Sequence, residues 1–272
     1  MRQLRSKIIS NIKISSKYHK LIFKENRIAN IIQPAQFLML KVTESKEILL
    51  RRPFSVHRAM GKNIEIIYEV VGRGTEALAH RNKGEYLDVI GPLGNGFSII
   101  DSRSSILVAG GIGVAPLMLL ASKLQERRPK TKPCLPAGRD LRPLVLIGAR
   151  TKKEILCEKE FKKLGYEVKI STDDGSKGLK GKVTELLKSI LRVSSIKHQA
   201  STIYACGPRP MLKEIGKLAK KYRIPAQLSL EEHLACGIGA CLGCVVKTKQ
   251  GYQRVCKDGP VFNAQDLVWQ GG

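Results

Sequence analysis

The first hundred residues alternate apolar and polar positions in short runs, a pattern that predicts β-strands. These runs are rich in β-branched residues, are bounded by turn-forming residues, and lie at residues 7–14, 21–24, 37–42, 64–71 and 85–90. We expect one short helical segment, residues 75–81, to interrupt them. Short strands of this kind pack as a small antiparallel barrel, so residues 1–101 are predicted to form a β-barrel domain.

From residue 104 onward, apolar strands alternate with amphipathic helices. Strands are expected at residues 106–109, 144–148, 167–171 and 202–205, and helices at residues 114–124, 153–164, 183–191 and 211–222. This alternation predicts a doubly wound parallel sheet over residues 102–226. A segment rich in Lys, Arg and Pro, residues 126–142, interrupts the alternation, and we interpret it as a surface insertion. The remaining residues, 227–272, form a small cysteine-rich module.

The chain has 48 Lys and Arg against 23 Asp and Glu, a formal net charge of +25, which raises nucleic-acid binding as a hypothesis. The cations are interleaved with apolar segments, and aromatic residues, which supply base-stacking platforms, make up only 5% of the chain. We therefore expect a solvated basic surface that suits an acidic partner or an unusual cytoplasm, and we expect no nucleic-acid partner. No apolar run reaches the roughly 18 residues of a membrane span, so we expect a cytoplasmic protein that binds no membrane.

Four cysteines near the C-terminus have the spacing C-x4-C-x2-C followed by a remote fourth: Cys236, Cys241, Cys244 and Cys256. This is the plant-type spacing for a [2Fe-2S] cluster, and the glycines between the ligands let the backbone wrap closely and point N–H groups at the sulfurs. A zinc site fits less well, because zinc ligands usually form two short pairs. A reduced structural set is the third reading. Disulfides are not expected, since the N-terminal segment lacks the apolar core of a secretory signal.

A second motif ends one of the predicted strands and consists of Arg52, Pro53, Phe54 and Ser55. The guanidinium of Arg52 can hold a flavin pyrophosphate bidentately, and Ser55 can bond to a phosphate or to the flavin edge. Further along, Gly74 and Thr75 lie where a short helix is predicted to begin, with Thr75 as its N-cap, and this gives a second phosphate-directed element. Tyr68 precedes it, and its ring could pack on the isoalloxazine. Together the two elements predict a flavin in the barrel.

Residues 106–116 predict a strand, a glycine turn with Gly110, Gly111 and Gly113, and a helix. Glycines allow close approach to a dinucleotide pyrophosphate, which the helix start would face; a tight turn in any α/β domain is the alternative. Two later strand ends support the dinucleotide, because ligands bind at the carboxyl ends of such strands. Cys206 is expected near the nicotinamide, and the acidic pair at residues 173–174 favours NAD over NADP.

With these motifs, the chain resembles the ferredoxin–NADP reductase superfamily. More narrowly, residues 228–244 and 255–262 resemble the electron-transfer subunits of the class 1B dihydroorotate dehydrogenases. The resemblance covers nearly the whole chain except the insertion at residues 126–142. The chain departs from the family at His233, where a longer side chain such as Arg is more usual.

The resemblance implies an oxidoreductase subunit of pyrimidine biosynthesis that works with an FMN-containing catalytic partner, commonly as a heterotetramer of two subunits of each kind. Dihydroorotate would be oxidised on the partner's FMN, and electrons would pass through the [2Fe-2S] cluster and FAD to NAD. FAD binding is assigned to Arg52, Pro53, Phe54, Ser55, Ile67, Tyr68, Glu69, Gly74 and Thr75. NAD binding is assigned to Gly110, Gly111 and Gly113, and the four cysteines would ligate the cluster.

We expect no residue to act as an acid or a base, because the chain has no Ser/His/Asp set or paired-carboxylate motif. Two alternatives stay open. One is a related flavin and iron–sulfur subunit that couples NAD(P)H to ferredoxin or to sulfur compounds. The other, from a different class, is a redox sensor or nucleic-acid-binding protein that uses the cluster as a switch.

Overall fold

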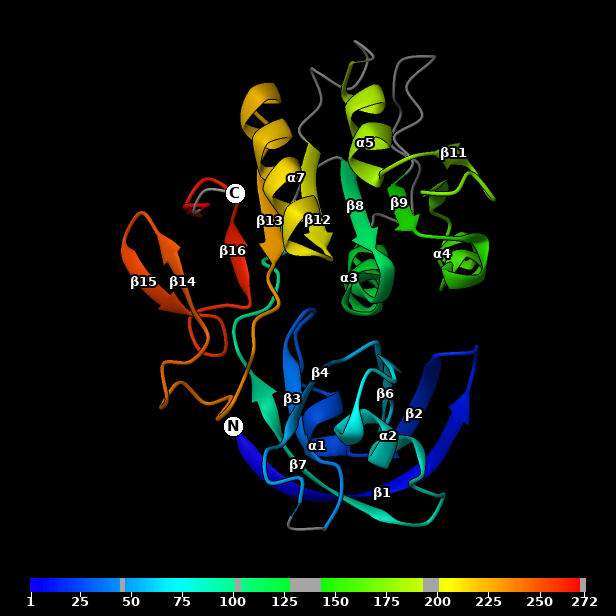
Figure 1. The fold of residues 1–272 in the computed structure, drawn as a ribbon, viewed down its shortest axis with the longest axis vertical. Coiled ribbons are helices and arrows are strands. Elements are labelled where there is room, and N and C mark those ends of the chain that lie inside the picture. The colour runs from blue at the N-terminus through cyan, green and yellow to red at the C-terminus, as the bar shows by residue number, and fades with distance from the viewer. Residues whose placement is uncertain (45–46, 101–103, 128–142, 193–200, 270–272) are drawn as a thin grey trace. The chain divides into compact units, whose positions relative to one another are not determined.

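The computed structural model describes residues 1–44, 47–100, 104–127, 143–192 and 201–269 (Figure 1). By contact, the chain divides into two compact units. The first contains residues 1–96 together with residues 229–262 and the C-terminal segment from residue 266, and the second contains residues 97–228 with the short segment 263–265. The predicted insertion at residues 126–142 falls almost entirely outside the described residues.

The first unit is built on a seven-stranded sheet in the order β4-β3-β7-β1-β2-β6-β5, with antiparallel neighbours. Its strands are β1 Arg2–Lys13, β2 Tyr18–Lys24, β3 Phe37–Lys41, β4 Arg52–Ser55, β5 Arg58–Met60, β6 Asn63–Glu69 and β7 Tyr86–Leu93. Strand β7 buries every second residue, as expected of a sheet with one face in a core. Contacts between β4 and β6, which are not ladder neighbours, curve the sheet toward closure. The predicted antiparallel barrel architecture is confirmed.

Two short helices interrupt these strands, where one was predicted. Helix α1, Asn26–Ala29, is capped by the carboxylate of Glu25, which accepts a hydrogen bond from the backbone N–H of Arg27. Four residues are too few to produce a helical periodicity, so the sequence pattern missed this helix. Helix α2, Arg73–Ala79, begins earlier than expected, and Gly72 is its N-cap. The prediction of Thr75 as N-cap was therefore wrong: its hydroxyl accepts from the N–H groups of Val71 and Gly72 from inside the helix.

A second sheet has the order β11-β10-β9-β8-β12-β13-β16; its strands β8 to β12 run parallel and lie in the second unit. Its strands are β8 Ser104–Gly110, β9 Leu144–Ala149, β10 Glu167–Thr172, β11 Leu179–Lys180, β12 Ser201–Cys206, β13 Ala226–Ser229 and β16 Val261–Asn263. The helical segments of the second unit are η1 Gly111–Gly113, α3 Val114–Glu126, η2 Lys152–Glu154, α4 Glu158–Lys163, α5 Val183–Arg192 and α7 Arg209–Tyr222. The predicted parallel nucleotide-binding architecture is confirmed.

The helix predicted over residues 153–164 is split into η2 and α4. Cys157, directly before α4, has a φ of 62°, and this left-handed backbone cannot continue a helix. Right-handed crossovers place α3 and α4 on one face of the sheet and α5 and α7 on the other, and α5 indeed packs against α7. None of the helices among the described residues is long and apolar enough to cross a membrane.

Strand order reverses at β8, because β9 lies on one side of it and β12 on the other. In open α/β sheets, ligands bind at the carboxyl ends of the strands where the order reverses. The glycine turn after β8 and the Cys206 turn after β12 both lie at that point.

The cysteine segment has little regular structure. Residues 236–244 form a series of turns, and the hairpin β14 Val245–Thr248 and β15 Gly251–Arg254 leads to Cys256. Sequence analysis did not predict this hairpin. By contact, residues 229–262 belong with the barrel. The predicted division into a flavin-binding barrel (residues 1–101), an NAD-binding domain (residues 102–226) and a cluster module (residues 227–272) stays a prediction.

Candidate cofactor and cluster sites

The structure brings the two predicted flavin elements of the barrel together. A Cβ atom placed on Gly74 would lie 2.5 Å from Nε of Arg52, so the Arg52 guanidinium rests directly on the first turn of α2. Arg51 points elsewhere, because its Nη2 donates to Oδ2 of Asp88 at 2.6 Å. Arg52 is half-buried, and its Nη1 donates to the carbonyl of Leu50 at 2.7 Å. The fork of Arg52, unlike that of Arg51, therefore lies where a pyrophosphate at the start of α2 could use it.

The aromatic residues of the same elements line the barrel interior. Tyr68 is 2% exposed, and its ring meets Phe54 edge-on at 5.6 Å and His19 at 5.5 Å between centroids. Its hydroxyl donates to Oδ1 of Asn11 at 3.0 Å, and burial raises the pKa of Tyr68 to about 12. The ring that we expected to face a flavin is thus packed against protein. A flavin role for Tyr68 and Phe54 stays a prediction.

The other residues assigned to FAD lie around these two. Pro53 and Ser55 are half-buried on β4, and Ile67 is buried on β6. Glu69 ends β6 and forms an ion pair of 3.3 Å with Lys17. Thr75 holds the start of α2 through its hydrogen bonds to the backbone at Val71 and Gly72. Their contacts with a flavin also stay predictions.

The three glycines of the nucleotide turn have different surroundings. A Cβ on Gly113 would lie 2.3 Å from the carbonyl oxygen of Cys206, and one on Gly110 would lie 2.6 Å from Sδ of Met211. These two glycines are needed for packing between the β8 and β12 turns. Gly111 has a φ of 54° and open space where a Cβ would be. It is therefore the position among the three where a pyrophosphate could approach the backbone.

The loop after β10 carries the acidic pair. Oδ1 of Asp174 accepts from the hydroxyl of Ser176 at 2.6 Å and from its backbone N–H at 2.9 Å, and these hydrogen bonds lower the pKa of Asp174. Asp174 is thus held within its own turn. Asp173 is exposed, and its side chain has no partner among the residues that the structure describes. Asp173 is the carboxylate of the pair that could reach a ribose.

Cys206, expected near the nicotinamide, is 1% exposed.

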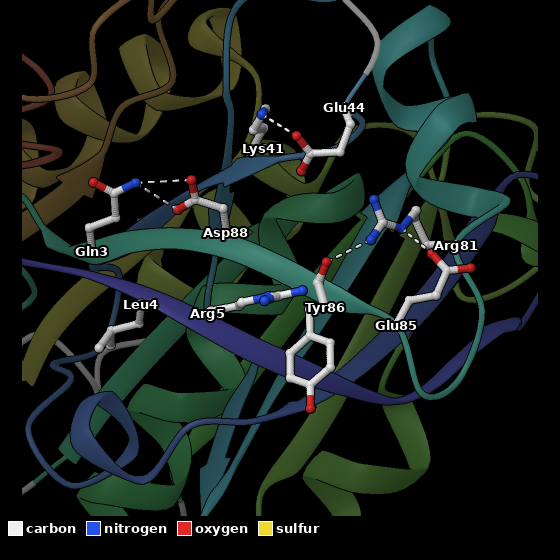
Figure 2. Close-up of a pocket in the computed structure, with 9 residues that line it drawn as sticks. All are labelled: Gln3, Leu4, Arg5, Lys41, Glu44, Arg81, Glu85, Tyr86 and Asp88. Carbon is white, nitrogen blue, oxygen red and sulfur yellow. Dashed lines mark hydrogen bonds and ion pairs between the residues drawn. The ribbon is translucent and has the colours of Figure 1, made fainter.

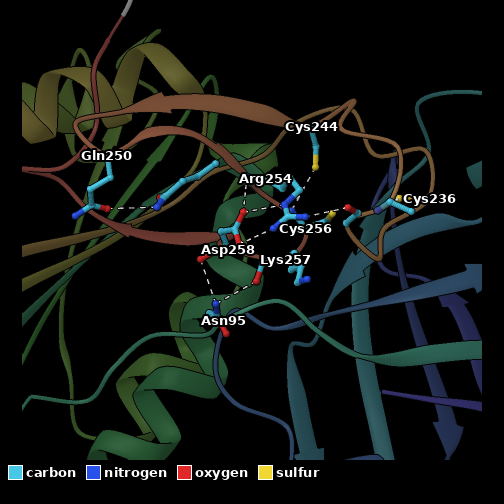
Figure 3. A network of polar contacts seen from close by, with 11 residues as sticks. Asn95, Cys236, Cys244, Gln250, Arg254, Cys256, Lys257 and Asp258 are labelled. Carbon is cyan, nitrogen blue, oxygen red and sulfur yellow. Dashed lines mark hydrogen bonds and ion pairs between the residues drawn. The ribbon is translucent and has the colours of Figure 1, made fainter.

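All four predicted cluster ligands belong to the first unit, where Cys236, Cys244 and Cys256 lie near one another (Figure 3) and Cys241 interacts with Cys236. Cys236 and Cys241 lie toward solvent, and Cys244 and Cys256 are buried. Two backbone N–H groups point at sulfur: Ala240 donates to Sγ of Cys236 at 3.3 Å, and Cys256 donates to Sγ of Cys244 at 3.4 Å. N–H groups directed at thiolate sulfur are the arrangement that an iron–sulfur cluster uses.

The pKa values of two of these thiols, Cys236 and Cys256, are shifted in opposite directions. Burial acts to raise the pKa of Cys236, but N–H groups of Cys241 and Ile238 outweigh it and lower that pKa to about 6. Burial and the neighbouring Cys244 raise the pKa of Cys256 to about 12. Metal ligands must lose their protons, and a buried thiol such as Cys256 does so when a cation binds beside it. The residues therefore fit a thiolate-bound metal cluster.

The cluster loop, residues 236–244, packs directly on strand β3 of the barrel. Gly237 has a φ of 69°, and a Cβ there would lie 2.6 Å from Cγ and 2.7 Å from Sδ of Met39. Met39 is fully buried on β3, and its partner across the β3–β4 ladder is Pro53 of the flavin motif. One residue of β3 thus separates the cluster loop from the strand that carries Arg52. This contact between distant parts of the chain could not be seen in the sequence.

Sequence analysis also missed the polar residues that surround the fourth ligand. Arg254 and Asp258 flank Cys256 at equal distance along the chain and bind each other through Nε and Oδ2 at 3.0 Å (Figure 3). Asn95, at the end of the barrel segment, donates to the carbonyls of Lys257 and Asp258 at 3.1 Å each. The sequence did offer one signal for them, namely two opposite charges four residues apart on either side of a predicted ligand.

A shallow groove of about 720 Å³ lies on the outer side of the barrel, along β1, β3 and β7 (Figure 2). None of the predicted site residues lines it. Its charges are largely satisfied within the groove: Lys41 pairs with Glu44, Gln3 donates to Asp88, and Arg81 pairs with Glu85. We assign it no role in cofactor binding.

Family models match the two regions with the clearest chemistry. A model described as the iron-sulfur cluster binding domain of dihydroorotate dehydrogenase B matches residues 231–268, which include all four cysteines. A model of the oxidoreductase NAD-binding domain matches residues 107–217, which include the glycine turn. The chain therefore carries an iron–sulfur cluster binding domain and an NAD-binding domain.

Relatives that match over their full length share one description, the electron transfer subunit of dihydroorotate dehydrogenase B (NAD(+)). The subunit of Caldanaerobacter subterraneus subsp. tengcongensis is 34% identical over 98% of this chain and 99% of its own length. That of Fusobacterium nucleatum is 38% identical, covering 94% and 95%. That of Geobacillus kaustophilus is 38% identical, covering 97% and 98%.

Solved structures agree on the fold. The structure of an NADH-dependent reduced ferredoxin-NADP oxidoreductase superposes with a TM-score of 0.81 at 28% identity, covering 97% of this chain and 90% of that one. A ferredoxin NADP+ reductase from Neisseria gonorrhoeae superposes with a TM-score of 0.65 at 15% identity, covering 82% and 92%. These matches confirm the predicted reductase-like fold of barrel and nucleotide-binding sheet.

Proposed function

The chain belongs to the family of dihydroorotate dehydrogenase B electron transfer subunits, and on that basis we propose that it passes electrons between a dihydroorotate-oxidising catalytic partner and NAD, using FAD and a [2Fe-2S] cluster. The observation that carries this proposal is the contact of Gly237 with Met39, which joins the cluster loop to the flavin strand within one unit. When bound, a flavin exchanges hydride with NAD and single electrons with a cluster.

The proposed cluster ligands are Cys236, Cys241, Cys244 and Cys256. Their C-x4-C-x2-C spacing with a remote fourth ligand supports a [2Fe-2S] cluster over other iron–sulfur types. The N–H groups of Ala240 and Cys256 that point at sulfur would stabilise the thiolates. Burial of Cys244 and Cys256 would keep water from two of the four ligands.

For FAD, the proposed site lies between β4 and the start of α2. Arg52 would bind the pyrophosphate, because its guanidinium rests on Gly74 while Arg51 is held by Asp88. Glycine at position 74 would be required, since any side chain there would displace the guanidinium. Ser55 and the backbone of residues 67–69 would contact the ring system, and the packed Phe54–Tyr68 pair would hold β4 and β6 at a fixed spacing.

For NAD, the proposed site is the carboxyl edge of the parallel sheet where strand order reverses. Gly111 would admit the pyrophosphate, and Gly110 and Gly113 would hold the β8 and β12 turns together beneath it. Asp173 would accept a hydrogen bond from a ribose hydroxyl and repel a 2′-phosphate, which supports NAD over NADP. No side chain is needed as an acid or a base.

The proposed partner is an FMN-containing dihydroorotate dehydrogenase subunit, in a heterotetramer of two subunits of each kind. The tip of the cluster loop suits a protein contact. Cys241 is exposed there, with the apolar side chains of Ile238 and Leu242 exposed beside it. Exposed apolar residues around a redox centre are what a docking surface for an electron-transfer partner would require.

The test is a UV–visible spectrum of the anaerobically purified full chain, recorded before and after one equivalent of NADH. We expect flavin bands over broad iron–sulfur absorption, and both should bleach when NADH is added. Addition of an FMN-containing dihydroorotate dehydrogenase subunit and dihydroorotate should then reduce NAD. A chain that stays colourless after reconstitution with FAD, iron and sulfide would refute the proposal.

A further inference from the structure

Arg254 lies two residues before the fourth cluster ligand and is held in one orientation by Asp258. Its Nε donates to Oδ2 of Asp258 at 3.0 Å, its Nη2 donates to Oδ1 at 3.2 Å, and its backbone N–H donates to Oδ2 at 2.8 Å (Figure 3). Both side chains are less than a third exposed. A fork-to-carboxylate pair with a third backbone bond fixes a guanidinium far better than an isolated surface ion pair.

The remaining arm of Arg254 reaches the loop that holds the first two ligands. Nη1 donates to the carbonyl of Gly239 at 3.2 Å, and Gly239 lies between Cys236 and Cys241. Arg254 thus joins the loop of the first three ligands to the turn that presents Cys256. Three backbone bonds close the same turn, from the N–H groups of Lys257, Asp258 and Gly259 to the carbonyl of Arg254.

The barrel anchors this turn from the other side. The side chain of Asn95 donates to the carbonyls of Lys257 and Asp258, and its backbone N–H donates to the carbonyl of Gly259. The position of Cys256 is therefore set from two directions, by Asn95 from the barrel and by Arg254 from the ligand loop. Removal of the guanidinium would therefore remove one of the two supports that hold Cys256 in position.

The cation of the pair lies among the segments that carry the sulfurs. Nη1 of Arg254 bonds to Gly239, between Cys236 and Cys241, and Arg254 itself is two residues from Cys256. Reduction of a cluster held by four thiolates adds one negative charge, and a fixed cation nearby stabilises the reduced form.

We propose that Arg254 is a positioning residue of the iron–sulfur site, which fixes Cys256 relative to the other three ligands and raises the reduction potential of the cluster. This inference rests on the proposed function, because it requires that the cysteines hold a cluster. Arg254 is not a ligand, yet it would influence how readily the cluster accepts an electron from the partner. Asp258 acts through Arg254 by keeping its fork turned toward Gly239.

The experiment uses the full chain and compares three variants with the parent. Arg254→Met removes the charge and the bond to Gly239. Arg254→Lys keeps the charge but cannot bind Asp258 and Gly239 at once. Lys249→Met is the control, because it removes one cation from the same hairpin at an exposed position whose side chain has no partner among the described residues. The measurements are iron content, the electron paramagnetic resonance spectrum of the reduced cluster, and its midpoint potential.

Arg254→Met is expected to make reduction of the cluster about tenfold less favourable at a fixed solution potential, which corresponds to a midpoint about 59 mV more negative. Arg254→Lys should retain most of the parent's potential but change the resonance spectrum or lower the iron content, because the geometry at Cys256 loosens. Lys249→Met should leave all three quantities unchanged, since an exposed charge away from the sulfurs is screened by salt.

Two outcomes would overturn the inference. If Arg254→Met binds iron and has the midpoint of Lys249→Met, the cation does not set the potential. If Arg254→Lys matches the parent in iron content and spectrum, the guanidinium does not position Cys256. Should Arg254→Met fail to fold, the lysine variant alone still decides the positioning role. A parent chain without any cluster would instead refute the proposed function, so the two failures are distinguishable.

Discussion

Replacement of Gly113 by alanine is expected to separate the two turns at the nucleotide edge of the parallel sheet. Gly113 has a helical φ of −58°, so alanine would meet no backbone strain there. The added Cβ would nevertheless lie 2.3 Å from the carbonyl oxygen of Cys206 and 2.8 Å from the backbone nitrogen of Gly207. Neither atom belongs to a flexible side chain, so the backbone itself must move.

The size of that movement follows from ordinary contact distances. Carbon needs about 3.5 Å from a neighbouring heavy atom, so the β8 and β12 turns must part by about 1 Å. Overpacking of this kind costs about 1–3 kcal/mol of the free energy of unfolding. A displacement of about 1 Å in a substrate-positioning site can also lower a rate by about a hundredfold. NADH turnover should therefore fall more than the stability loss alone would explain.

The assay is NADH oxidation by the full chain with ferricyanide as an artificial acceptor, together with thermal unfolding. Gly165→Ala is the matched control. Gly165 has a φ of 81° and open space around it, and it lies before β10 at the opposite end of the sheet. Alanine there should cost about 1–2 kcal/mol through the left-handed backbone without touching NADH kinetics. Gly113→Ala with the parent's unfolding midpoint and NADH kinetics would refute this reasoning.

Three further predictions follow from the sites. Cys241→Ser should lose the cluster and electron transfer to the partner but keep reduction of the flavin by NADH, as measured in anaerobic spectra. If NADH no longer reduced the flavin in this variant, the cluster site and the flavin site would not be independent. Arg52→Ala should weaken FAD binding about 10–100-fold, the loss of a charge-assisted hydrogen bond, whereas Arg51→Ala should bind FAD like the parent in a fluorescence titration. Hydrogen bonds from Lys162 and Lys177 lower the pKa of Glu158, so its contribution to stability is present above the ordinary carboxyl pKa and is lost as the pH falls through the lowered value. Glu158→Gln should therefore melt slightly below the parent at pH 7, and the difference should disappear as the pH falls through the lowered pKa; a difference that persists in strong acid would contradict this assignment.

The features that sequence analysis predicted correctly depend on near neighbours in the chain. The parallel strands β8, β9, β10 and β12 were found from short apolar runs, because buried strands need no distant information to be recognised. The iron–sulfur binding segment was located from the spacing of its cysteines, and the family model over residues 231–268 confirms that segment, while the four ligands themselves stay a prediction. Thr75 was misplaced because a glycine can serve as N-cap without any side chain, and the sequence pattern favours a hydroxyl there.

The features that sequence analysis missed depend on contacts between distant segments. Nothing in the sequence of Phe37–Lys41 indicates that Met39 contacts Gly237, because Met39 looks like any core residue of a strand. Asn95 is equally ordinary in sequence, yet its amide holds the turn after Cys256. Such residues gain their roles only when folding brings the two segments together.

The division of the chain into two units has a physical consequence for electron transfer. Single-electron transfer between two centres requires that their separation stay short and constant, whereas a dinucleotide must enter and leave at each turnover. The buried side chain of Met39 contacts Gly237, and Met39 pairs with Pro53 across the β3–β4 ladder, so one strand links the cluster loop to the strand with the predicted flavin motif inside one unit. The glycine turn that would admit NAD belongs to the other unit. Exchange of a dinucleotide at that turn would then leave the packing of the cluster loop on β3 unchanged.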